Sequence, residues 1–88
     1  PDILFSRCVL EPTSQIVQTL NARHPMIPVI GFAKGAGLRL QQYAQTGIQA
    51  LGIDSMTPLP WAIRHAGGKV TQGNLDPFLL AAGGPLLD

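Results

Sequence analysis

The sequence has 88 residues, of which 45% are hydrophobic and 12% are charged, and its formal net charge is +1. A chain of this length forms at most one small domain, and it is too apolar to belong to a disordered protein. The small net charge gives no long-range attraction to nucleic acid or to an acidic membrane, so we expect neither as a partner. The charged fraction is low for a small domain that must solvate its whole surface.

The single cysteine, Cys8, allows no internal disulfide and predicts a reducing, cytoplasmic location. No apolar run has the length of a membrane-spanning helix, and no signal peptide is visible. The sequence starts at Pro1 without a methionine and stops at Asp88 within an apolar pattern. We therefore expect a partial domain over residues 1–88 that is incomplete at both ends.

Residues 2–23 have the periodicity of a helix. Apolar side chains at steps of about four residues predict one apolar face, formed by Phe5, Cys8, Val9, Ile16, Val17 and Leu20. On such a face the Cys8 thiol should be inert. Pro12 should kink this helix or split it in two, because proline lacks a backbone donor and clashes with the preceding turn. His24-Pro25 predicts its end.

Strands and helices alternate in the rest of the chain. The predicted strands are residues 27–32, 49–53 and 69–72, and the first, continuously apolar, is typical of a strand buried on both faces. The predicted helices are residues 38–46, with Leu40, Tyr43 and Ala44 on one side, then residues 58–66 and 77–82. Residues 85–87 should begin a further helix.

The resulting order, α-β-α-β-α-β-α, predicts an α/β fold with three parallel strands joined by right-handed crossovers. The strands begin near Pro28, Gln49 and Lys69, a spacing typical of a fragment of an eight-stranded β/α barrel, the TIM barrel. Part of an open, doubly wound sheet is the alternative, and the spacing alone does not separate the two.

Polar residues follow the carboxyl ends of these strands, where α/β enzymes place their sites. Lys34 lies in a glycine-rich loop whose N–H groups are suited to an anion, although a tight turn explains the same glycines. Asp54 ends the second strand, either to hold a substrate group or a neighbouring loop, or to cap backbone N–H groups. The amides of Gln72 and Asn74 either line a pocket or join loops. We expect these four residues at a pocket rim.

Asp76 and Pro77 have a structural explanation. Aspartate is a favoured N-cap and proline a favoured first helical residue, so together they predict the start of the helix at residues 77–82. A metal site is not expected, because the chain has one cysteine and two distant histidines and contains no zinc-binding motif.

The stretch Gln72–Pro77, Gln-Gly-Asn-Leu-Asp-Pro, closely resembles uroporphyrinogen decarboxylase. Weaker similarity covers nearly the whole chain, at residues 10–13, 23–25, 28–32, 35–37, 47, 50–54 and 83–84. The resemblance implies a single β/α barrel, of which this chain would hold about strands five to seven. It also implies a carboxy-lyase that needs no cofactor and converts uroporphyrinogen to coproporphyrinogen in haem biosynthesis by removing four acetate carboxyl groups.

The same resemblance has consequences for residues and partners. The family's principal catalytic residues lie in segments before and after this stretch, so no catalytic residue is predicted here. The expected partners are the porphyrinogen substrate and, for the full-length protein, a second copy in a homodimer. The 88 residues alone should self-associate and be inactive.

Two alternatives remain open. Zinc-dependent methyltransferases acting on corrinoids or coenzyme M are similar in fold, but they carry a His-x-Cys zinc motif where this chain has Phe32 and Lys34. Neither residue is a usual zinc ligand, which favours the decarboxylase. The other alternative is a non-catalytic α/β module, and the apolar composition counts against it.

Overall fold

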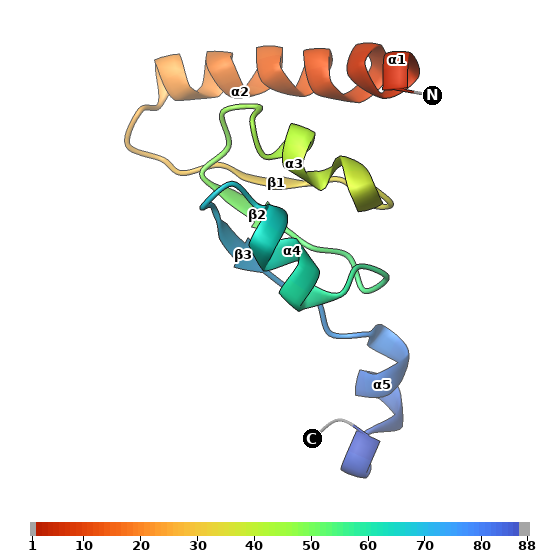
Figure 1. Ribbon diagram of the computed structural model, residues 1–88. Coiled ribbons are helices and arrows are strands. Elements are labelled where there is room, and N and C mark those ends of the chain that lie inside the picture. Colours follow the sequence, from red (N-terminus) through yellow and green to blue (C-terminus); the bar gives the residue numbers. More distant parts are fainter. Residues whose placement is uncertain (1, 87–88) are drawn as a thin grey trace.

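A computed structural model describes residues 2–86 of the chain (Figure 1). Its centre is a three-stranded parallel sheet, in the order β1 (Ile30–Phe32), β2 (Ala50–Gly52) and β3 (Val70–Gln72). Ile30 pairs with Ala50, and Ala50 pairs with Val70. The α/β class, the parallel strands and the predicted element order are confirmed, although each strand is shorter than its apolar pattern.

The first helix continues through Pro12 without a break. It consists of α1 (Asp2–Phe5), a π-helical turn (Ser6–Leu10) and α2 (Glu11–Arg23). The Glu11 N–H donates to the Ser6 carbonyl, five residues back, so the wide turn comes directly before the proline. A π-helical turn changes the local hydrogen-bond pattern of a helix. The chain thus accommodates the missing proline donor, and the helix is not split in two.

The later helices are short. A 3₁₀ turn (Gly37–Arg39) precedes α3 (Leu40–Tyr43), so the predicted helix at residues 38–46 is α-helical in its middle only. The other two are α4 (Leu59–His65) and α5 (Pro77–Ala82). A 3₁₀ turn (Gly84–Leu86) begins where the last helix was predicted, and Leu87 lies outside the described residues. No helix among the described residues combines the length and hydropathy needed to cross a bilayer.

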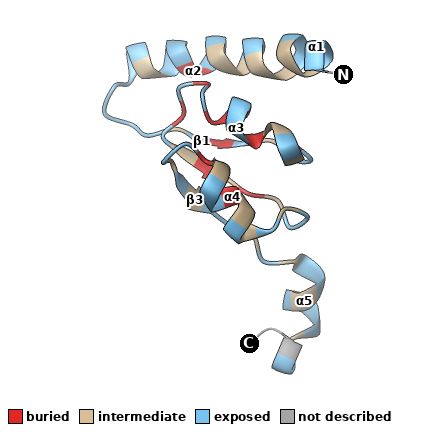
Figure 2. Ribbon diagram, in the orientation of Figure 1, coloured by how far each residue is buried: buried red, intermediate tan, exposed pale blue. Residues whose placement is uncertain are grey.

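The hydrophobic core lies between the helices and one face of the sheet (Figure 2). Leu51 on β2 is fully buried, and so is Ile48 just before that strand. Leu40, Tyr43 and Ala44 face this core, as their spacing predicted. The remaining core residues are Val17, Ala36, Ile53, Ala62 and Ala66.

The opposite face of the sheet is open. Ile30, Phe32 and Val70 are 54%, 56% and 70% exposed. The prediction that the first strand is buried on both faces is therefore wrong for the described residues, because only Gly31 of β1 is buried. No described element covers this face, and α5 projects away from the sheet without a buried residue (Figure 1).

The apolar face predicted for the first helix is only partly right. Val17 is buried and Phe5 and Val9 pack against the core, but Ile16 is 61% exposed. Adjacent helical residues point about 100° apart, so Ile16 turns away from the core when Val17 enters it. Leu20 and Cys8 are exposed on the same helix, which corrects their predicted burial. Burial therefore does not shield the Cys8 thiol.

Candidate functional site

The loops that follow the three strands meet around the Asp54 carboxylate. Its Oδ2 atom accepts a hydrogen bond of 2.6 Å from the Gly35 N–H, in the loop after β1. Its Oδ1 atom accepts from the Thr57 hydroxyl at 2.7 Å and from the Met56 N–H at 3.2 Å, both in the loop after β2. Asp54 thus binds two loops at once, which combines two of the roles that its position suggested.

Asn74 connects the third loop to the same cluster. Its Nδ2 atom donates to the Asp54 carbonyl at 2.8 Å and to the Thr57 carbonyl at 2.5 Å. Asn74 follows β3, whereas both acceptors belong to the loop after β2. Asp54 and Asn74 together therefore join the loops after all three strands, and we call this set of hydrogen bonds the Asp54–Asn74 clamp.

The clamp also stabilises the charged form of the Asp54 carboxyl. The Gly35 N–H, and after it the Thr57 hydroxyl, hold the pKa of the Asp54 carboxyl below its ordinary value of 3.8, whereas desolvation opposes them. Hydrogen bonds donated to a carboxylate stabilise its charged form. Asp54 is an anion at neutral pH with or without this shift, and protein donors already occupy both of its oxygens. The N–H group of the glycine-rich loop that was expected to attract an anion binds this carboxylate.

Gly73 brings the third loop close to the end of β2. Its φ is +118°, and the Gly73–Asn74 peptide bond is cis. A Cβ atom at Gly73 would lie 2.6 Å from the Ile53 carbonyl oxygen, a distance that real Cβ atoms do not adopt. Only glycine fits this approach without a shift of the backbone.

An open hollow of about 410 Å³ lies beside the clamp. Its lining combines apolar surface with one cation and one anion, and consists of Phe32, Lys34, Ile53, Asp54, Ser55, Gly73, Asn74, Leu75 and Pro77. Three of the four predicted rim residues therefore lie around one hollow. Gln72 is not among the lining residues, and its backbone carbonyl accepts a hydrogen bond from the Ile53 N–H at 2.8 Å.

Asp76 lies at the N-terminus of α5. Its Oδ1 atom accepts a hydrogen bond of 2.9 Å from the Phe78 N–H, and Pro77 is the first residue of the helix. This contact stays within the segment that contains Asp76. Unlike Asp54, Asp76 makes no hydrogen bond to another loop in the described part of the chain.

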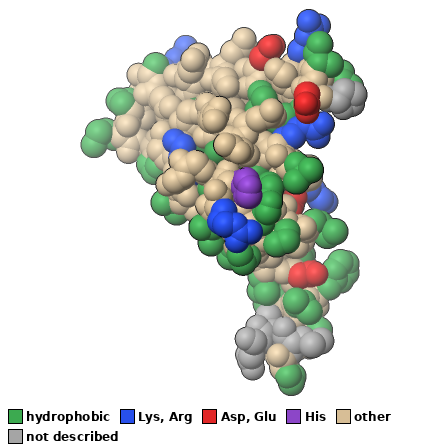
Figure 3. Space-filling model, viewed as in Figure 1, with side chains coloured by type: hydrophobic (Ala, Val, Ile, Leu, Met, Phe, Trp, Pro, Cys, Tyr) green, Lys and Arg blue, Asp and Glu red, His purple; other side chains and the backbone are tan. Residues whose placement is uncertain are grey.

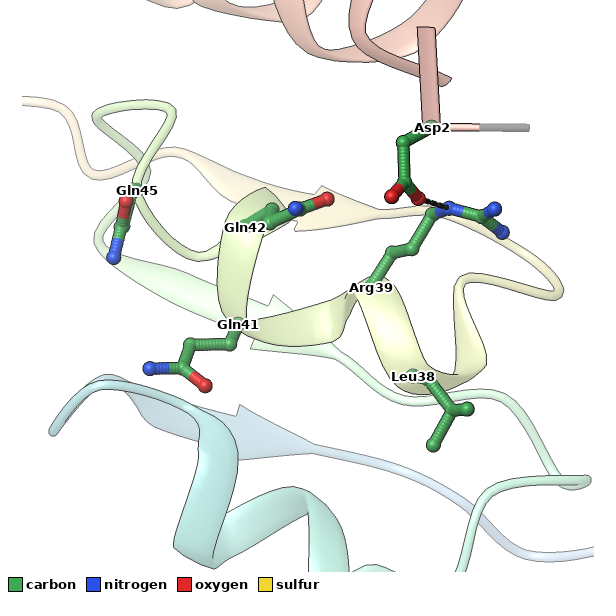
Figure 4. A pocket seen from close by; sticks show the side chains of 6 residues that line it. All are labelled: Asp2, Leu38, Arg39, Gln41, Gln42 and Gln45. Atoms are coloured by element: carbon green, nitrogen blue, oxygen red, sulfur yellow. Dashed lines mark hydrogen bonds and ion pairs between the residues drawn. The ribbon is translucent and has the colours of Figure 1, made fainter. Parts of the chain in front are cut away.

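A larger hollow of about 560 Å³ lies among the helices, and Figure 4 shows the six residues that line it. They are Asp2, Leu38, Arg39, Gln41, Gln42 and Gln45. The Arg39 Nε atom is 3.1 Å from the Asp2 Oδ1 atom, and the Arg39 guanidinium lies 5.4 Å from the centre of the Phe5 ring. Both charged side chains are solvated, and exposed ion pairs contribute at most about 1 kcal/mol. The contacts of Arg39 with Asp2 and Phe5 connect the 3₁₀ turn to the first helix.

Other polar groups give no second site. Charged side chains of both signs are scattered over the face that Figure 3 shows. Across residues 2–86, no three His, Cys, Asp or Glu side chains converge as metal ligands would. The His65 ring stacks on the Trp61 ring with 4.1 Å between their centroids, and the His65 Nδ1 atom lies 2.8 Å from the Trp61 carbonyl oxygen. Both residues belong to α4, so these contacts are local to that helix.

Three members of the clamp, Gly35, Met56 and Thr57, were not predicted from the sequence. Thr57 follows Asp54 by three residues, a spacing at which an aspartate in a turn often binds a neighbouring hydroxyl or N–H, so a local signal existed. Gly35 gave no such signal as a partner of Asp54. The two residues are 19 positions apart, and only the parallel pairing of β1 with β2 brings them together.

Parallel strands with helices between them, and polar residues at the carboxyl ends of the strands, define a protein of the α/β class, and this arrangement is consistent with part of a β/α barrel. The family model described as uroporphyrinogen decarboxylase matches residues 1–87. The chain belongs to the uroporphyrinogen decarboxylase family.

Curated relatives named uroporphyrinogen decarboxylase support this assignment. The protein from Rhizorhabdus wittichii is 51% identical over 88 residues, which cover 96% of this chain and 25% of that protein. The Novosphingobium aromaticivorans protein is 45% identical over 86 residues, with the same two coverages. The Rhodospirillum rubrum protein is 42% identical over 90 residues, covering 100% of this chain and 26% of that protein. The chain thus spans about a quarter of the length of the relatives it matches.

Proposed function

We propose that the complete protein carrying this segment decarboxylates uroporphyrinogen to coproporphyrinogen. The observation that carries the proposal is the family match over residues 1–87, together with relatives of the same name at up to 51% identity. Each round of the reaction releases one acetate carboxyl group as CO₂ and leaves a methyl group on the ring. The proposal includes no cofactor.

Within this proposal, the residues of this segment bind the substrate and do not transfer protons to the reacting ring. Loss of CO₂ needs a site that stabilises a protonated pyrrole, and a buried carboxylate provides such stabilisation. Asp54 is a poor candidate, because three protein donors already bind its carboxylate oxygens. The residues that act on the reacting ring therefore belong to other segments of the proposed barrel.

The hollow beside the clamp is the proposed contact with substrate. Lys34 is exposed at its rim and makes no ion pair among the described residues, so its ammonium is available to a substrate carboxylate. Phe32 and Leu75 offer apolar surface to the porphyrinogen ring. Asp54 and Asn74 line the same hollow. Gln72 does not line it, and we propose Gln72 as a rim residue of the complete pocket only from its position at the end of β3.

The complete protein is proposed to be a homodimer and to act in the cytoplasm. The open sheet face, with Ile30, Phe32 and Val70 exposed, supports burial of this surface against further protein. In a complete barrel this sheet face would pack against the remaining strands, so residues 1–88 are proposed to be one part of a barrel domain. The single cysteine supports a reducing compartment.

The decisive experiment is an anaerobic turnover assay of the complete protein with uroporphyrinogen, in which coproporphyrinogen is measured after oxidation to the porphyrin. A matched pair of variants tests the hollow. Lys34→Ala should raise KM, whereas Lys69→Ala, which removes a lysine that does not line the hollow, should leave KM unchanged. Turnover no faster than buffer, with zinc-dependent methylation of a thiol and stoichiometric bound zinc, would establish a methyltransferase instead.

A further inference from the structure

The Asp54–Asn74 clamp has a consequence for Lys34. Lys34 precedes Gly35, whose N–H donates to the Asp54 Oδ2 atom at 2.6 Å. Gly35 has a φ of +74°, and a Cβ atom there would meet nothing within 4 Å outside its chain neighbours. The adjacent Ala36 is buried in the core, so the loop is held by this burial and by the bond to Asp54. The bond to Asp54 connects the backbone beside Lys34 to the end of β2.

The clamp is built as a unit. One Asp54 oxygen holds the loop after β1, the other holds the loop after β2, and the Asn74 amide joins the loop after β3 to the second. Among the described residues, the other charged contact between segments is the Arg39–Asp2 pair, which joins the 3₁₀ turn to the first helix and involves none of these loops. Hydrogen bonds to a charged group are shorter and stronger than neutral ones, so these bonds restrict the loops effectively.

We propose that Asp54 and Asn74 are positioning residues, which hold the three loops as one unit and thereby place the Lys34 ammonium at the rim of the hollow. This inference rests on the proposed function where it concerns substrate. Asp54 does not contact the substrate in this scheme. It acts through Lys34, and a correctly placed ammonium lowers the entropy lost when a carboxylate binds.

The kinetic test is a double-mutant cycle in the complete protein, with Asp54→Asn, Lys34→Ala and both together. Asparagine preserves the shape but has one acceptor oxygen, so a bond to one loop is lost. Each single variant should raise KM for uroporphyrinogen about tenfold and change kcat less than twofold. The double variant should be no worse than Lys34→Ala, because Asp54 has no role once the lysine is gone.

Two kinetic results would overturn the proposal. A fall in kcat of about a hundredfold with KM unchanged would place Asp54 among the groups that act on the reacting ring. Losses that multiply in the double variant would show that Asp54 and Lys34 act independently. Asp76→Asn is the matched control, because its hydrogen bond stays within its own segment, and it should leave both constants unchanged.

Amide hydrogen exchange tests the clamp without any activity. In Asp54→Asn, residues 34–37, 55–57 and 73–75 should all exchange about tenfold faster or more, while Asp76→Asn should affect only the start of α5. If Asp54→Asn does not fold, Asn74→Ala replaces it, because it keeps the Asp54 carboxylate and removes only the third loop. Faster exchange confined to residues 55–57 in Asp54→Asn, or unchanged exchange at residues 73–75 in Asn74→Ala, would refute the clamp. A protein that does not turn over uroporphyrinogen but shows the expected exchange would refute the proposed function and retain the clamp.

Discussion

Replacement of Gly73 by alanine tests the close approach of the third loop to β2. The new Cβ atom would lie 2.6 Å from the Ile53 carbonyl oxygen, and the φ of +118° is one that L side chains rarely adopt. An unfavourable backbone conformation costs roughly 1–3 kcal/mol, and overpacking against a rigid backbone atom costs roughly another 1–3 kcal/mol. The variant should therefore lose about 2–6 kcal/mol of unfolding free energy, a large part of the roughly 5–15 kcal/mol typical of a domain.

Gly68→Ala is the matched control for this measurement. Gly68 also has a positive φ, +79°, but a Cβ atom there would find nothing within 4 Å. Gly68→Ala should therefore lose only the free energy of the unfavourable backbone conformation, roughly 1–2 kcal/mol. Equilibrium denaturation of the complete protein with urea gives both values. Equal losses in the two variants would refute the argument, because they would show that the contact with Ile53 costs nothing.

Three further predictions concern separate features. Asp76→Ala should cost roughly 0.5–2 kcal/mol of unfolding free energy through loss of the Phe78 N–H acceptor, with turnover per folded molecule nearly unchanged; a large loss of turnover at an unchanged melting temperature would contradict this. Because folding lowers the pKa of Asp54 from 3.8, its contribution to stability is complete above that value and is lost as the pH falls through the folded pKa. The difference in unfolding free energy between wild type and Asp54→Asn should therefore be constant near neutral pH and shrink below about pH 4, and a difference that grows on acidification would reverse the assigned sign. The 88 residues alone should self-associate and show no decarboxylase activity, because the sheet has two edge strands and an open apolar face; light scattering that showed a monodisperse, active monomer would refute this.

Much of the local structure could be predicted from the sequence, because local rules determine it. Leu40, Tyr43 and Ala44 follow helical spacing, and all three are buried. The helix predicted at residues 77–82 has those bounds in the structure, since an aspartate followed by proline at its start and a glycine at its end leave little choice. The alternation of strands and helices likewise predicted a parallel sheet, because two parallel strands need a crossover between them.

Tertiary structure decided which surfaces are covered and which residues meet. The apolar periodicity of the first helix includes both Val17 and Ile16, but only Val17 is buried in the core. The apolar run at residues 27–32 predicted burial on both faces, whereas burial requires a second layer that no described element provides. Asp54 was recognised as a residue at the end of a strand. Its partner Gly35 depends on the pairing of β1 with β2, which places residues 19 positions apart within hydrogen-bonding distance. Local sequence patterns report what a residue favours along its own segment, and contacts between segments follow only from the packing of the whole sheet.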